Sequence, residues 1–222
     1  MTTVHVVRHG EVHNPAKILY GRLPGYHLSD LGRQMAEVVG EALRPRPIGL
    51  VVSSPLERAQ ETAEPIAAAH GLEIQTDPRL IEAGNHFQGL EFGVGDGSLK
   101  HPQHWRYLTN PFKPSWGEPY AQIVRRMLGA LADARDDVRA LGDPARSEAV
   151  LVSHQLPVWT VRSAVEGKKL WHDPRRRQCT LASVTSFTYD DHDVIIAVTY
   201  TEPAKALLPV DVGGVPKFSA GA

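Results

Sequence analysis

Three short apolar runs, each followed directly by polar residues that can bind an anion, constrain the fold of this chain more than any other feature. The runs are Val4–Val7, Ile48–Val52 and Ala149–Val152, and stretches with helical spacing lie between them. Each run is short and, apart from His5 in the first, apolar throughout, as in a strand that is buried on both faces. Strands that alternate with helices predict an α/β fold, a three-layer sandwich with a mostly parallel central sheet flanked by helices.

The segments around these runs carry the start and stop signals of helices. Ser29 or Asp30 can cap the first helix, whose apolar residues fall on one face, and Pro55 is well placed at the start of the second. The expected helices cover Leu31–Leu43, about Leu56–His70, roughly Glu118–Leu141 and about Pro157–Glu166. The further expected strands are Leu72–Thr76 and a closing pair, Leu181–Tyr189 and Val194–Tyr200, which predicts an antiparallel edge.

The length of 222 residues suits one domain with a sizeable core, and we expect residues 1–201 to form a single catalytic domain. Between about 83 and 119, glycines, prolines and aromatic residues are scattered without a sustained period. Long irregular stretches inside a compact domain are more often functional lids than spacers. Residues 202–222, rich in Gly, Pro and Ala, are predicted to form an irregular tail.

Composition excludes several classes of partner. The net charge is −1, so there is no global electrostatic case for binding nucleic acid or a membrane surface. No apolar run is long enough to cross a membrane, and no signal-type segment precedes the first strand. A single cysteine, Cys179, cannot form an intramolecular disulfide, which fits a reducing compartment. The expected location is therefore the cytoplasm.

The polar residues that follow the three runs predict a phosphoryl site. They are Arg8-His9-Gly10, Ser53-Ser54-Pro55 with Arg58 three residues later, and Ser153-His154-Gln155. Strand ends of an α/β sheet can converge on one crevice, which would bring two arginines and two histidines together. Four such donors match the non-bridging oxygens of a phosphoryl group. A histidine beside a fixed positive charge is also a good nucleophile toward an anionic phosphoryl group.

A phosphate ester needs a proton for its leaving oxygen. Glu82, in Arg79-Leu80-Ile81-Glu82, can supply it if burial or the nearby anion raises the pKa of its carboxyl group.

Five motifs in order resemble those of the histidine phosphatase superfamily, in the branch of cofactor-dependent phosphoglycerate mutases and small-substrate phosphatases. The resemblance covers most of Val4–His154, extends toward Tyr200 and implies a phosphoglycerate mutase-like fold. It implies that His9 becomes phosphorylated, that Arg8, Arg58 and His154 bind the phosphoryl oxygens, and that Glu82 is the general acid and base. No metal and no cofactor are implied. The motifs are Arg8-His9-Gly10-Glu11, Leu28-Ser29-x-x-Gly32, Ser53-Ser54-Pro55-x-x-Arg58-Ala59-x-x-Thr62-Ala63, Leu80-x-Glu82 and Val152-Ser153-His154.

Three residues are candidate substrate contacts around this core. Gln155 stands where family members usually have glycine, and its amide could donate to the phosphate or narrow the pocket. Asn14 approximates the asparagine of the family, although the spacing is one residue short. Arg22 is the candidate contact on the substrate side.

The segment after the catalytic acid favours a phosphatase over a mutase. Mutases of this branch have an Arg-rich segment there, whereas Ala83–Glu91 contains no arginine and the next one is Arg106. The expected partner is a small phosphorylated substrate. A mutase is the runner-up, a non-catalytic protein that binds a phosphorylated ligand is a third interpretation, and a homodimer through an edge strand stays open.

Two histidine pairs and one run of arginines are interpreted as having no metal-binding or nucleic-acid-binding role. The pairs His9/His13 and His101/His104 have spacings that could bind metal on a helix, but neither has a helical context. Arg175–Arg177 is interpreted as a solvated loop rather than a nucleic-acid patch. Guiding an anionic substrate is the weaker hypothesis for this loop.

Overall fold

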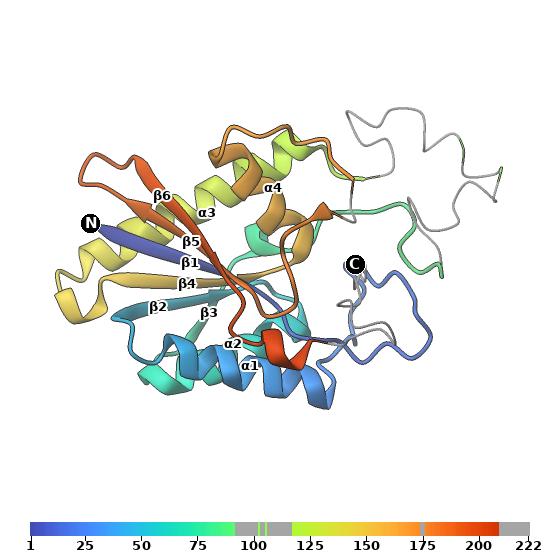
Figure 1. Ribbon diagram of the computed structural model, residues 1–222, viewed down its shortest axis with the longest axis horizontal. Coiled ribbons are helices and arrows are strands. Elements are labelled where there is room, and N and C mark those ends of the chain that lie inside the picture. The colour runs from blue at the N-terminus through green and yellow to red at the C-terminus, as the bar shows by residue number, and fades with distance from the viewer. Residues whose placement is uncertain (92–101, 103–104, 106–116, 174–175, 209–222) are drawn as a thin grey trace.

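The computed structural model describes residues 1–91, 102, 105, 117–173 and 176–208. In these residues a central sheet lies between two layers of helices (Figure 1). Its strands are β1 (Thr2–Arg8), β2 (Ile48–Ser53), β3 (Ile74–Thr76), β4 (Glu148–Ser153), β5 (Val184–Tyr189) and β6 (Ile195–Thr201). The strand order is β3-β2-β4-β1-β5-β6. The helices are α1 (Asp30–Leu43), α2 (Glu57–His70), α3 (Tyr120–Ala140) and α4 (Gln155–Val165).

The sheet is parallel except at one edge. β4 pairs in parallel with both β1 and β2, and β3 pairs in parallel with β2. β5 is antiparallel to β1, and β6 is antiparallel to β5. Both the three-layer α/β sandwich and the antiparallel edge that the sequence predicts are therefore confirmed.

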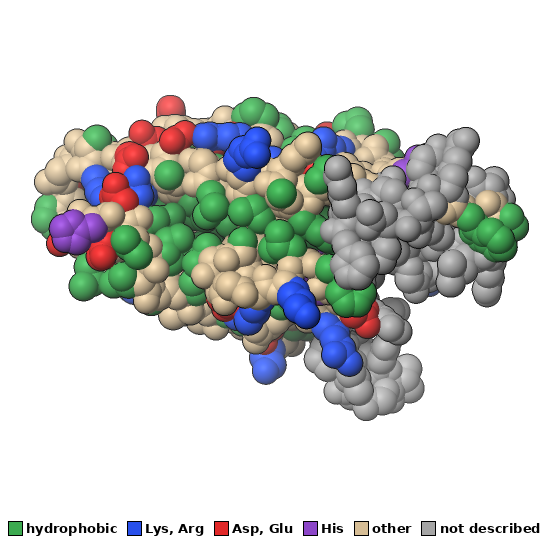
Figure 2. Space-filling view, turned by 90° about the horizontal axis from the view of Figure 1, so that it is seen from above, with side chains coloured by type: hydrophobic (Ala, Val, Ile, Leu, Met, Phe, Trp, Pro, Cys, Tyr) green, Lys and Arg blue, Asp and Glu red, His purple; other side chains and the backbone are tan. Residues whose placement is uncertain are grey.

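Two apolar cores hold the layers together. One lies between the sheet and α3 and α4, and includes Ile123, Met127 and Leu131 of α3. The other lies between the sheet and α1 and α2, and includes Met35, Val39 and Ile66. On the side of α3 and α4, hydrophobic side chains gather in a band at the surface (Figure 2). Partly buried residues that pack on this core are Leu156, Trp159, Val165, Leu170, Ile195 and Val198.

Two local features explain where α1 begins and how the segment after β1 packs against α1. The hydroxyl oxygen of Ser29 accepts a hydrogen bond from the Gly32 amide at 2.9 Å, so Ser29 rather than Asp30 is the N-cap. A Cβ atom on Gly10 would lie 2.5 Å from the carbonyl oxygen of Gly32. The segment after β1 can therefore pack on α1 only because residue 10 has no side chain.

Several boundaries differ from the expectation. α4 begins at Gln155, directly after His154, although Pro157 was expected at its start. Proline is tolerated there because the first helical turn has no acceptor for its N–H group. β5 begins at Val184 rather than Leu181, because Ala182 adopts a left-handed conformation (φ 53°) that interrupts the strand. β3 covers only Ile74–Thr76 of the expected Leu72–Thr76.

Part of the predicted lid and tail can be placed. Asn85 and Gly117 form an isolated antiparallel bridge, so the described ends of the 83–119 segment meet. After β6, Lys205–Leu207 form one 3-10 turn, and Ala204 is buried against the core on the side of α1. Most of 92–116 and all of 209–222 lie outside the described residues. None of the helices described is both long and apolar enough to cross a membrane.

Candidate active site

The carboxyl ends of three parallel strands bring the predicted residues together. His9 follows β1, Ser54 follows β2 and His154 follows β4. The parallel register sets Arg8 opposite Ser153, and the His9 amide donates to the carbonyl of Ser153 at 3.1 Å. The imidazole rings of His9 and His154 consequently lie 5.1 Å apart, centroid to centroid. The structure therefore brings the residues at the ends of these three strands together, as the sequence predicts.

His9 is fully buried and held in one tautomer. Its Nδ1 lies 2.7 Å from the carbonyl oxygen of Gly10. A carbonyl can only accept, so Nδ1 carries the hydrogen and Nε2 of the neutral ring keeps its lone pair. Among the described residues, Nε2 has no hydrogen-bond partner. Burial, together with the charges of Arg58 and Arg8, lowers the pKa of His9 well below its ordinary value. This nitrogen is therefore available as a nucleophile.

Two arginines flank this imidazole and bind carbonyl oxygens. Nη2 of Arg58 donates to the carbonyl of Gly21 at 2.6 Å, and Nη1 of Arg8 donates to the carbonyl of Cys179 at 2.6 Å. Nε and Nη1 of Arg58 are buried, with no partner among the residues described. The guanidinium of Arg58 also lies 4.7 Å from the centroid of the Tyr20 ring. Arg58 therefore presents unused donors beside His9 in a site from which water is largely excluded.

His154 is fixed by Ser54. Its Nε2 lies 2.8 Å from the Ser54 hydroxyl oxygen, and its buried Nδ1 has no partner in the described part of the chain. Burial and the charge of Arg58 lower the pKa of His154 well below its ordinary value. The second histidine is therefore neutral unless an anion enters the site.

Glu82 is a buried carboxyl group with one oxygen unused. It is 2% exposed, and its Oε1 accepts from the Ala83 amide at 2.7 Å. Its Oε2 is buried and has no partner among the described residues. Burial raises the pKa of Glu82, and this effect outweighs the opposing influence of the Ala83 hydrogen bond and of Arg58. A carboxyl group with a raised pKa of this kind is suited to act as a general acid.

The three candidate substrate contacts have different surroundings. Both polar atoms of the Asn14 amide are used inside its own loop, by the carbonyl of Ile18 at 2.7 Å and the amide of Ile18 at 3.1 Å. Nε of Arg22 donates to the backbone carbonyl of Glu82 at 2.6 Å, which ties it to the acid. Gln155 is 3% exposed and its Oε1 accepts from Nη1 of Arg177 at 3.1 Å.

Three residues that shape the site were not among the predicted site residues. Thr62 accepts from the Gly10 amide at 3.1 Å and donates to the Arg58 carbonyl at 2.7 Å, so it couples β1 to α2. Tyr20 is 4% exposed and covers Arg58. Arg177 is half-buried, so the interpretation of a solvated loop fails for it, although Arg176 is exposed. Thr62 stood within a quoted motif, and Arg177 stood within the basic loop for which guidance of an anionic substrate was the weaker hypothesis, whereas Tyr20 carries no local signal.

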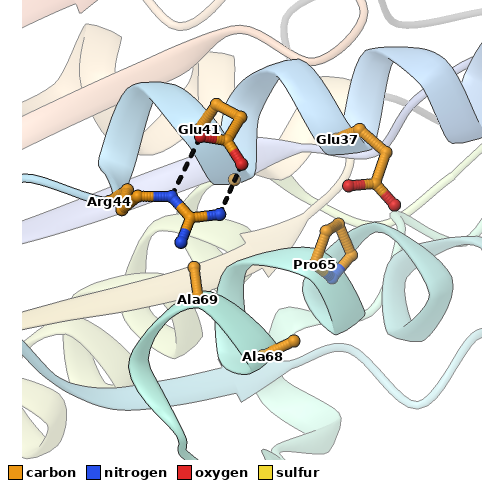
Figure 3. Close-up of a pocket in the computed structure, with 7 residues that line it drawn as sticks. Glu37, Glu41, Arg44, Pro65, Ala68 and Ala69 are labelled. Carbon is orange, nitrogen blue, oxygen red and sulfur yellow. Dashed lines mark hydrogen bonds and ion pairs between the residues drawn. The ribbon is translucent and has the colours of Figure 1, made fainter.

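Two surface hollows lie away from His9. One, of about 220 Å³, lies between α1 and α2, where the carboxylate of Glu41 binds Arg44 and neutralises it (Figure 3). The other, of about 330 Å³, lies between β3 and α3. In the described residues no three His, Cys, Asp or Glu side chains gather as metal ligands would, and His101 and His104 lie outside those residues.

Comparison with known proteins gives consistent matches. The family model described as histidine phosphatase superfamily (branch 1) matches residues 4–201. The uncharacterized protein Rv0525 of Mycobacterium tuberculosis is 58% identical over 203 residues, which cover 91% of this chain and 97% of that protein. A Yersinia pestis protein named probable phosphoglycerate mutase GpmB is 33% identical over 192 residues, which cover 83% of this chain and 85% of that protein.

Solved structures share the fold. The native structure of the mycobacterial glucosyl-3-phosphoglycerate phosphatase Rv2419c matches with a TM-score of 0.71 at 25% identity, and the match covers 90% of this chain and 98% of that one.

Proposed function

The chain belongs to the histidine phosphatase superfamily (branch 1), and we propose that it hydrolyses a small phosphate monoester through a phosphohistidine on His9. The observation that carries this proposal is the tautomer of His9. The carbonyl of Gly10 holds the hydrogen on Nδ1 and leaves Nε2 with a free lone pair beside the unused donors of Arg58. That combination is what in-line attack on an anionic phosphoryl group requires.

In the first step, Nε2 of His9 attacks the phosphorus atom and the bond from phosphorus to the ester oxygen breaks. The leaving oxygen takes the proton of the Glu82 carboxyl group and departs as an alcohol. Arg8, Arg58 and His154 donate hydrogen bonds to the phosphoryl oxygens, on which negative charge accumulates. The raised pKa of Glu82 supports this step, because the carboxyl group must be protonated when the ester binds.

In the second step, a water molecule attacks the phosphorus atom of the phosphohistidine. Glu82, now a carboxylate, accepts a proton from that water, and the bond from phosphorus to Nε2 breaks. Inorganic phosphate leaves, and His9 and Glu82 return to their starting protonation states. The lowered pKa of His9 supports the release, because the nitrogen ends the cycle as a neutral base.

Two observations bear on the choice between hydrolysis and mutase-type transfer. Ala83–Glu91 contains no arginine, and the structural neighbour at 25% identity is named as a phosphatase. The Yersinia pestis relative at 33% identity is named as a probable phosphoglycerate mutase, so transfer of the phosphoryl group to a second alcohol is the alternative.

The test is hydrolysis of 4-nitrophenyl phosphate with a chelator present, for the wild type, His9→Ala and the control His13→Ala, whose side chain is exposed. We expect the wild type and the control to turn over the ester and His9→Ala to be inactive. Turnover by His9→Ala at the wild-type rate would contradict the proposal. Adding glycerol at high concentration tests the alternative, since a mutase-type enzyme would form glycerol phosphate in preference to inorganic phosphate.

A further inference from the structure

Several arginines other than Arg58 act on the catalytic carboxyl group, and their surroundings differ. The charges of Arg177 and Arg126 both lower the pKa of Glu82, and Arg22 binds its backbone carbonyl. Arg22 and Arg126 share the carboxylate of Glu118, with Nη2 of Arg22 at 2.9 Å from Oε2 and Nε of Arg126 at 2.9 Å from Oε1. Part of their charge is therefore neutralised within the fold.

Arg177 has only neutral partners among the described residues. Its Nη1 donates to Oε1 of Gln155 at 3.1 Å, and its Nε donates to Nε2 of His172 at 2.8 Å. Nδ1 of His172 donates to the carbonyl of Leu170 at 2.6 Å, so this imidazole is neutral and can accept at Nε2. No carboxylate of the described residues forms an ion pair with Arg177.

These partners orient the guanidinium without cancelling its charge. The ring of His172 packs against Tyr120 and Trp159, with centroids 5.9 Å and 5.7 Å away, so the acceptor for Nε is itself held in place. Burial lowers the pKa of Arg177, but an arginine stays protonated in proteins. A charge that is half-buried, oriented and not neutralised is suited to receive an anion.

The position of Arg177 indicates which part of a substrate it would meet. Gln155 directly follows His154, so the guanidinium lies beside the phosphoryl-binding residues. Its charge also acts on Glu82, which serves the leaving oxygen under the proposed function. Arg177 is therefore close to Glu82 as well as to the phosphoryl-binding residues, where it can meet a group carried by the leaving alcohol.

We propose that Arg177, oriented by Gln155 and His172, is a specificity-determining residue that binds a second anionic group on the alcohol part of the substrate. This inference rests on the proposed function, because Glu82 defines the leaving-group side. It also explains the glutamine at position 155, since a glycine there could not hold the guanidinium. Gln155, a candidate substrate contact, and Arg177, from the loop whose weaker interpretation was guidance of an anionic substrate, then form one subsite.

The experiment compares phenyl phosphate with its 4-carboxy and 4-phosphono derivatives. The variants are Arg177→Gln, Arg177→Lys and the matched control Arg176→Gln, which changes the exposed neighbour. For the wild type, we expect kcat/KM to be at least tenfold higher for one or both anionic esters than for phenyl phosphate. Arg177→Gln should lower this preference by about 10- to 100-fold, the factor that a hydrogen bond to a charged group contributes. Arg177→Lys should keep part of the preference for anionic esters, and Arg176→Gln should keep all of that preference.

Three results would overturn the inference: no preference in the wild type, equal loss for all three esters in Arg177→Gln, or the same loss in Arg176→Gln. The two anionic derivatives distinguish a carboxylate from a second phosphate as the natural group. If the wild type hydrolyses none of the esters, the proposed function fails, and binding of phenylphosphonate and 4-carboxyphenylphosphonate still tests the subsite. The subsite is supported if the wild type binds 4-carboxyphenylphosphonate more tightly than phenylphosphonate and Arg177→Gln does not. The subsite is contradicted if the wild type binds the two phosphonates with equal Kd values.

Discussion

Arginines at the two ends of the parallel strands differ in their partners. The amino end carries the N-terminus and the β5–β6 hairpin, at the left of Figure 1. There the carboxylate of Glu148 binds His5 at 2.9 Å and Nε of Arg46 at 2.8 Å. Asp193 in the hairpin binds Arg139, and also Arg135 at 3.5 Å. Each of these three arginines therefore has a carboxylate partner.

At the carboxyl end, Arg58 and Arg177 have no such partner within the described residues. Arg58 donates to the carbonyl of Gly21, and Arg177 donates to an amide and an imidazole. Carbonyl and amide oxygens orient a guanidinium but do not cancel its charge, so the charge stays available for an anion. We therefore expect Arg58 and Arg177 to contribute to anion binding more than to stability, and the carboxylate-paired arginines at the amino end to contribute to stability.

The largest expected effect comes from removing a cation at the carboxyl end. Arg58→Met should lower kcat/KM for an aryl phosphate by about 10³-fold, because it removes donors aimed at the phosphoryl oxygens. The free energy of unfolding, measured in urea, should fall by less than about 1 kcal/mol or rise, since the variant removes a buried charge without a carboxylate partner. A large loss of stability with little loss of activity would reverse the roles of the two ends.

The opposite pattern is expected at the amino end. Glu148→Gln leaves Arg46 and His5 without their carboxylate, and should lower the free energy of unfolding by about 1–3 kcal/mol. Activity toward the same aryl phosphate should stay at the wild-type level, because Glu148 lies at the start of β4 and the site lies at its end. A loss of kcat/KM in Glu148→Gln as large as that in Arg58→Met would contradict the difference between the two ends.

A smaller effect is expected in the pH dependence of stability. The folded-state pKa of His154 is lowered, so below pH 6.5 the unfolded chain binds a proton that the folded chain does not. Stability is therefore lost as the pH falls, by up to about 1.4 kcal/mol per pH unit for one such group. His154→Gln should reduce this slope relative to the wild type, with His13→Gln as the matched exposed control. An unchanged slope would show that His154 is not held neutral in the folded protein.

Much of this arrangement could be predicted because its signals are local. A buried strand followed by Arg-His-Gly or Ser-His identifies both the strand and the polar residues at its end, and parallel strands necessarily present those ends together. His9 and His154 could be predicted from their positions at strand ends, whereas Arg58 depended on the Ser-Ser-Pro segment before it and on the family resemblance. The structure brings all three together.

The missed features depend on contacts between distant segments. The lack of arginines in Ala83–Glu91 suggested few cations near Glu82, yet Arg22, Arg126 and Arg177 approach it from other parts of the chain. Nothing in the sequence near Arg177 indicates that its partners are Gln155 and His172, one of them 22 residues away in the chain. Similarly, the amide of Asn14 could not be known to bind Ile18 before the loop was folded.

The most direct test of the account is to trap the phosphorylated enzyme. Glu82→Gln cannot activate water, while 4-nitrophenolate leaves without needing a proton, so this variant should accumulate the intermediate from 4-nitrophenyl phosphate. We predict close to one acid-labile phosphoryl group per chain, found by mass spectrometry on Nε2 of His9 and absent when His9 is also changed to Ala. Turnover with no phosphoryl group on His9, or with the group on another residue, would contradict the account.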